Sequence, residues 1–136
     1  YNFADYWDHW LSFAERLDNL PGIFHVNWFR QDDDGKFMWP GFGENLRVLR
    51  WIIDRCENRA NAVPTPIGNL PAPSDIDTRG LSIEEETLQA LLSVNTEQWQ
   101  AEMDAVGEYL ASYGDRLPGA LRQACDDVIQ ELRGAE

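Results

Sequence analysis

The residues best suited to chemistry lie between Phe24 and Asn45, where aromatic side chains gather in and beside a loop. The loop is rich in Gly, Pro and Asp, residue types that favour turns, so we expect it to lie at the surface. A ring held at the surface offers a flat ligand a face to stack on. The rings of this stretch that we expect to matter are those of Trp28, Phe29, Phe37, Trp39 and Phe42.

Phe42 is flanked by Gly41 and Gly43, and Glu44 and Asn45 follow at an expected helix start. We expect both glycines to let the backbone adopt conformations closed to other residues and to leave the ring uncrowded. The sequence matches neither GxGxxG nor GxxxxGK[ST], so a base is the expected cargo of this loop, and phosphate is not. Spacing alone leaves open a glycine turn with Phe42 tucked inward, and a helix-capping role for Asn45.

Three adjacent carboxylates, Asp32, Asp33 and Asp34, precede Gly35. They lack the alternating spacing and the distal Glu of a calcium loop. A solvated turn is therefore the preferred interpretation over a metal site.

The elements that must position this loop are mostly helical. The spacing of apolar residues predicts an amphipathic helix from Phe3 to Leu17 and another from Glu44 to Cys56. The alternation from Ile23 to Phe29 predicts a strand, and Lys36–Trp39 is a candidate to return as its hairpin partner. The second helix is expected to bury one stripe, made of Leu46, Leu49, Ile52, Ile53 and Cys56.

The region from Glu57 to Leu81 is expected to be an extended connection, with a candidate short strand at Ile67–Leu70. Beyond it we predict a helical tail with caps at Ser82 and Asn95. Gly114 and Pro118 then separate two apolar stripes, which predicts an antiparallel helix pair. The segment as a whole is expected to be a helix-dominated α+β structure with a short strand or hairpin.

Composition restricts the classes of partner. The 136 residues can bury one sizeable core, and a net charge of −13 argues against nucleic acid and anionic membranes, whose phosphates need Lys and Arg. No signal peptide or membrane span is apparent. Cys56 and Cys125 fall at apolar helix positions without a CxxC pattern, so we expect two buried thiols in a reducing compartment.

The aromatic stretch resembles GTP-dependent phosphoenolpyruvate carboxykinase, and the similarity extends over nearly the whole chain. Only the C-terminal part of that enzyme is covered, so we expect the chain, which starts at Tyr1 without Met, to be a segment of a longer protein. The helical tail after Ser82 matches in pattern only. The residues that carry the resemblance are Phe24–Arg30, Gly35–Asn45, Arg47–Leu49 and Trp51, with Tyr1–Phe3 and His9–Leu11 upstream and Thr65–Gly68, Pro71 and Gly80–Leu81 downstream.

The resemblance implies an α/β parent fold in which residues 1–81 supply a guanine-pocket segment and residues 82–136 a helical tail on the same lobe. It implies that aromatic rings surround guanine, that Phe42 stacks on the base and that Asn45 hydrogen-bonds its edge. Gln31 and Leu46 depart from the family's usual residues without touching these positions. The nucleotide-binding residues so implied are Trp28, Phe29, Phe37, Phe42, Gly43, Glu44 and Asn45.

The implied reaction converts oxaloacetate and GTP to phosphoenolpyruvate, GDP and CO₂, a gluconeogenic step in the cytoplasm. Mn²⁺ and Mg²⁺ assist in the parent enzyme, which the resemblance implies is a monomer. No catalytic residue or metal ligand is expected in this segment, so we predict that it is inactive alone. The alternative from another class is a non-enzymatic helical interaction module, with the aromatics as core or as a peptide-binding surface.

Overall fold

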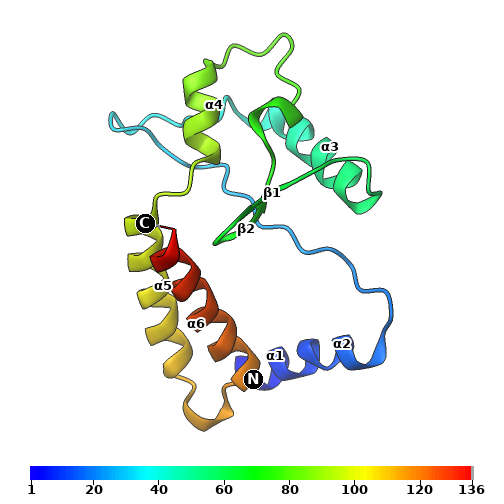
Figure 1. Ribbon diagram of the computed structural model, residues 1–136, viewed down its shortest axis with the longest axis vertical. Coiled ribbons are helices and arrows are strands. Elements are labelled where there is room, and N and C mark those ends of the chain that lie inside the picture. The colour runs from blue at the N-terminus through cyan, green and yellow to red at the C-terminus, as the bar shows by residue number, and fades with distance from the viewer. Residues whose placement is uncertain (136) are drawn as a thin grey trace. The chain divides into compact units, whose positions relative to one another are not determined.

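The computed structural model describes residues 1–135 and is dominated by helices (Figure 1). Two compact units are present: the first joins Tyr1–Pro21 to the segment from Val94 onward, and the second is Gly22–Ser93. The helices are α1 (Phe3–Leu11), α2 (Phe13–Arg16), α3 (Asn45–Cys56), α4 (Glu85–Leu92), α5 (Thr96–Ala111) and α6 (Gly119–Gly134). Three short 3₁₀ turns, η1 (Phe42–Glu44), η2 (Pro73–Asp75) and η3 (Gly114–Arg116), accompany two strands, β1 (Val63–Thr65) and β2 (Gly68–Leu70).

In the first unit, α5 and α6 pack against each other as the predicted antiparallel pair, connected through η3 (Figure 1). Asn95 caps the N-terminus of α5 as predicted, because its Oδ1 accepts the Gln98 N–H at 2.9 Å. The predicted N-terminal helix is interrupted at Ser12, which separates α1 from α2. The ring of Trp7 lies edge-on to Tyr109 of α5 and to Tyr113 just beyond that helix, with centroids 6.4 and 4.9 Å apart, and so packs α1 against the end of α5.

In the second unit, Trp39, Trp51 and Ile76 form the buried core. Trp51 comes from the middle of α3, whereas Trp39 and Ile76 come from connections on either side of it. The antiparallel β1–β2 hairpin, in which Val63 pairs with Leu70, confirms a strand within the predicted Ile67–Leu70 stretch.

Several sequence predictions for this unit are wrong in detail. The predicted strand at Ile23–Phe29 does not form: residues 23–27 have no regular secondary structure, and Trp28 and Phe29 lie in a turn. An isolated bridge between Gln31 and Phe37 is what remains of the expected hairpin. A strand needs a backbone partner as well as alternation. Ser82 does not cap a helix, because α4 begins at Glu85 with Glu84 as its N-cap residue.

The third correction concerns the buried face of α3. Leu46, Leu49 and Ile53 are 69%, 43% and 49% exposed, and Trp51, on the opposite side of the helix, is the buried residue. Of the predicted stripe, Ile52 is confirmed, since it packs together with Val48 and Trp51 in the core. α3 thus carries apolar residues on two faces, a pattern usual for helices buried on both sides. Cys56 shares the outer face and is exposed, contrary to prediction, whereas Cys125 is buried as predicted.

Candidate functional site: an exposed aromatic wall beside Asn45

A tight hairpin around the acidic turn presents the first aromatic residues. The Met38 N–H donates to the Arg30 carbonyl at 2.9 Å, and the Asp32 N–H donates to the Lys36 carbonyl at 3.0 Å. The Arg30 guanidinium donates to the Leu91 carbonyl at 3.2 Å, which ties the hairpin to the end of α4. Backbone pairing and this one long side chain therefore hold a segment that has no strand of its own.

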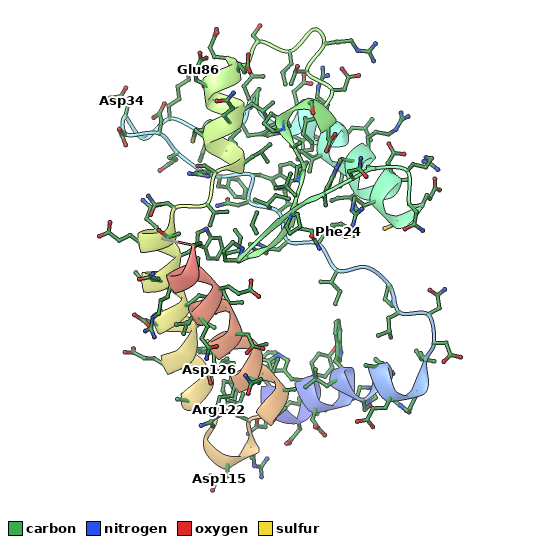
Figure 2. All side chains as sticks on the ribbon, viewed as in Figure 1. Phe24, Asp34, Glu86, Asp115, Arg122 and Asp126 are labelled. Atoms are coloured by element: carbon green, nitrogen blue, oxygen red, sulfur yellow. The ribbon has the colours of Figure 1, made fainter. Side chains whose placement is uncertain are left out.

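The acidic turn itself has a structural role. The Asp32 Oδ1 accepts the N–H groups of Asp34 and Lys36 at 3.1 and 2.9 Å, an arrangement that stabilises a turn. Asp34 lies at the tip of this loop (Figure 2). Among residues 1–135 there is no group of three or more His, Cys, Asp or Glu side chains that could hold a metal ion.

The aromatic residues divide into an inner and an outer set. Trp39 is buried, and the half-buried Trp28 packs against it with ring centroids 6.1 Å apart. Phe29 and Phe37 are exposed and meet edge to face, 5.9 Å apart. The two indoles therefore anchor the loop on the core, while the phenyl rings face outward.

Phe42 is the most exposed of these rings, at 92%, which excludes the interpretation in which it is tucked inward. It has no ring contact with another aromatic residue among those the structure describes. Gly41, with φ at +133°, adopts a backbone conformation that other residues rarely reach. Gly43 lies within the 3₁₀ turn and needs no such freedom, so the conformational role predicted for both glycines applies to Gly41 alone.

Asn45 is the first residue of α3 and does not cap it. Its Oδ1 instead accepts the indole N–H of Trp39 at 2.9 Å. The capping interpretation of Asn45 is therefore wrong. The Asn45 amide is bonded to a residue of the preceding loop, and the buried Trp39 indole sets its orientation.

Glu44 is held by an ion pair with Arg47 at the start of α3. The Arg47 Nε lies 2.6 Å from a Glu44 carboxylate oxygen, and its Nη1 donates to the Asp77 carbonyl at 2.5 Å. The side-chain hydrogen bond from Arg79 holds the pKa of Asp77 well below its usual range. Charged groups at this end of α3 are thus paired with one another.

Comparison with known proteins places these residues in a family. A family profile described as "Phosphoenolpyruvate carboxykinase C-terminal P-loop domain" matches residues 1–131. The chain belongs to the GTP-dependent phosphoenolpyruvate carboxykinase family. The match covers the aromatic loop and most of the helical tail, so the alternative of an unrelated helical interaction module loses its support.

Several curated relatives of the carboxykinase family share this segment. Proteins named "Phosphoenolpyruvate carboxykinase [GTP]" from Chlamydia muridarum and Neocallimastix frontalis are each 45% identical, over 98% and 99% of the chain. The protein of that name from Treponema pallidum is 42% identical over 100% of the chain. In each case the chain spans 22% of the relative's length.

The structure therefore brings some of the predicted site residues together and leaves Phe42 without an aromatic partner among the described residues. Phe29 meets Phe37, Trp28 meets Trp39, and Asn45 is bonded to Trp39. Trp39 was not among the predicted binding residues. The available signal was chemical: a buried indole N–H needs an acceptor, and Asn45 supplies one six residues further on.

Proposed function

We propose that this chain forms the base-binding wall of a GTP-dependent phosphoenolpyruvate carboxykinase. The proposal is carried by two observations: Phe29, Phe37 and Phe42 are exposed, and the Asn45 amide is held in one orientation by Trp39. The names of the relatives specify GTP, and the chain matches them across the loop. The proposed nucleotide-binding residues are Trp28, Phe29, Phe37, Phe42, Gly43, Glu44 and Asn45.

Stacking and hydrogen bonding divide the work of this wall. An exposed phenyl ring stacks on a base and contributes on the order of 1–3 kcal/mol per base, with little preference for one base over another. Selection needs hydrogen bonds to the base edge, which Asn45 is placed to make. The wall holds one end of GTP so that the distant phosphates lie in a fixed position.

The whole reaction is proposed for the longer chain: oxaloacetate and GTP give phosphoenolpyruvate, GDP and CO₂, as in gluconeogenesis. Phosphoryl transfer depends on positioning and on stabilising charge, commonly with metal ions. The described residues supply no metal-ligand cluster, so ligands for the proposed Mn²⁺ and Mg²⁺ would come from outside this segment. We accordingly propose that the isolated chain does not turn over, and phosphoenolpyruvate formation by it would contradict this.

Other parts of the proposal concern the context of the longer enzyme. We propose an α/β parent fold, with residues 1–81 as the guanine-pocket segment and residues 82–136 as a helical tail of the same lobe. The enzyme is proposed to act as a cytoplasmic monomer, without nucleic acid or membrane partners. No helix among the described residues has the length and apolar character to cross a membrane.

The test is a titration of GTP and ATP into the full-length enzyme and its Phe42→Ala variant. We expect GTP to bind more tightly than ATP to the wild-type enzyme. Loss of the ring should weaken GTP binding by about tenfold or more, the equivalent of one stacking interaction. Unchanged GTP affinity in Phe42→Ala would show that the base-site assignment is wrong.

A further inference from the structure

The hydrogen bond between Trp39 and Asn45 connects the core of the second unit to the proposed base wall. Trp39 is 7% exposed and packs with Trp51 and Ile76, so its indole has one available position. The Asn45 side chain is half-buried and lies 2.9 Å from the indole nitrogen. The core therefore determines how the amide is turned.

An indole N–H is a donor only, so the amide atom that faces it must be the oxygen. The Asn45 Nδ2 group is consequently the free end of the amide. It has no hydrogen-bond partner among the residues that the structure describes. We propose that Trp39 is a positioning residue for base selection, because it makes Asn45 present a donor and prevents it from presenting an acceptor.

This inference rests on the proposed function and explains how one amide can choose between purines. Guanine has an acceptor, O6, where adenine has a donor, the N6 amino group. An amide free to rotate by half a turn would serve either base. Rotating Asn45 here would set its NH₂ group against the Trp39 N–H and leave a buried donor unpaired, which is costly. The preference for guanine over adenine thus depends on the buried side chain of Trp39, which fixes the Asn45 amide.

The experiment compares the affinities of GTP, ITP and ATP for the full-length enzyme and its Trp39→Phe variant. Phenylalanine retains an aromatic ring in the core but removes the N–H. We expect the ratio of GTP affinity to ATP affinity to fall about tenfold, the effect of one net hydrogen bond. ITP should change in parallel with GTP, because hypoxanthine retains the O6 acceptor.

Trp51→Phe is the matched control. Trp51 is 5% exposed in the same cluster, and its Nε1 has no hydrogen-bond partner among the described residues. This variant loses a similar ring and a similar N–H without touching Asn45. The GTP-to-ATP ratio should therefore stay at the wild-type value.

A second variant, Asn45→Asp, tests the inference if Trp39→Phe fails to fold. A carboxylate accepts the indole N–H with one oxygen and offers the base an acceptor with the other. The preference should then shift toward ATP. An unchanged ratio in Trp39→Phe, or an equal loss for all three nucleotides, would overturn the positioning role.

Failure of the proposed function has a different signature. It would appear as a wild-type enzyme without preference for GTP, or as a Phe42→Ala variant with unaltered affinity. A wild-type preference for GTP that depends on Phe42 but not on Trp39 would refute the positioning role alone.

Discussion

Phe29 and Phe37 stand edge to face across the acidic turn, with ring centroids 5.9 Å apart and planes at 65°. Backbone hydrogen bonds on both sides of the turn keep them in register, including that from the Met38 N–H to the Arg30 carbonyl. The Phe29 N–H in addition donates to the Asn27 Oδ1 at 2.9 Å. The two rings therefore act as one surface, and neither is positioned independently of the other.

The first prediction follows from this pairing. Phe37→Ala in the full-length enzyme should weaken GTP and ATP binding by a similar factor, about three- to tenfold. An edge-to-face pair contributes about 0.5–1.5 kcal/mol, and its loss frees the Phe29 ring without altering any selective hydrogen bond. Calorimetric titration measures both affinities. Ile23→Ala is the control, since Ile23 is 82% exposed and belongs to no ring pair. A changed GTP-to-ATP ratio in Phe37→Ala would contradict this account.

The two glycines around Phe42 should respond differently to alanine. Gly41→Ala places a Cβ on a backbone at φ +133° and should cost more than about 1 kcal/mol in folding or shift the loop. Gly43→Ala should leave folding stability unchanged, because Gly43 lies in the 3₁₀ turn without a positive φ and a Cβ there meets nothing within 4 Å. GTP affinity and thermal denaturation of both variants provide the measurement. Equal effects at the two positions would argue against the backbone role of Gly41.

Asp54 should contribute a pH-dependent part of the stability. The hydrogen bond from Arg59 and a second from Arg50 lower the pKa of Asp54 from its ordinary 3.8. Since the folded-state pKa lies below the unfolded value, this stabilisation is complete above about pH 3.8 and disappears as pH falls through the lower folded value.

Thermal denaturation across this range tests the Asp54 prediction. Asp54→Asn should be less stable than wild type at pH 7, and the two should converge as the pH falls below 3.8. Asp33→Asn, which alters an exposed turn, serves as the control. A gap between Asp54→Asn and wild type that does not narrow as the pH falls below 3.8 would show that charge is not the cause.

The two thiols should differ in reactivity. Cys56 is exposed, whereas Cys125 is 7% exposed and burial raises its pKa, with Asp126 and Asp104 adding to the effect. Because the thiolate is the reactive form, Cys56 should be alkylated first in the native chain. Peptide mass spectrometry after timed iodoacetamide treatment measures each site. Denatured protein should lose the difference, and faster native labelling of Cys125 would contradict the structure.

The outer face of α3 predicts the behaviour of the isolated chain. Leu46, Leu49 and Ile53 lie on one side of the helix and are 69%, 43% and 49% exposed. Contiguous apolar surface of this kind promotes association. The isolated chain should self-associate in sedimentation experiments, and Leu49→Lys should shift it toward the monomer. Tyr109→Lys, which changes an exposed aromatic residue of α5, is the control. An equal shift toward the monomer in Tyr109→Lys would show that the association does not depend on the outer face of α3.

The helices could be predicted from sequence because their apolar spacing and end signals agree. Asn95, Gly114 and Pro118 delimit α5 and α6 close to where expected. The wrong predictions concern segments whose local sequence pattern is compatible with two different structures. Ile23–Phe29 alternates like a strand, but alternation does not reveal whether a backbone partner is available. The apolar spacing of α3 likewise fitted an outer stripe, because the sequence does not show that Trp51 packs on the opposite side.

The candidate site shows the same limit. Spacing alone left open whether Phe42 is tucked inward, and the resemblance favoured an exposed ring, which its 92% exposure confirms. The link between Trp39 and Asn45 could not be derived from spacing, since Asn is also common at helix starts, and both roles fit its position. Only the three-dimensional path of the loop decides between them.

The division of the chain into units has a practical consequence for engineering. Every residue of the proposed base wall belongs to Gly22–Ser93, and so does the Trp39–Trp51–Ile76 core that supports it. The stretch is continuous, whereas the other unit needs both ends of the chain. A chimera with two splice points, after Pro21 and after Ser93, would therefore exchange the proposed base wall together with the core that supports it. Exchanging this one segment between two related enzymes should therefore transfer the nucleotide preference of the donor enzyme to the recipient.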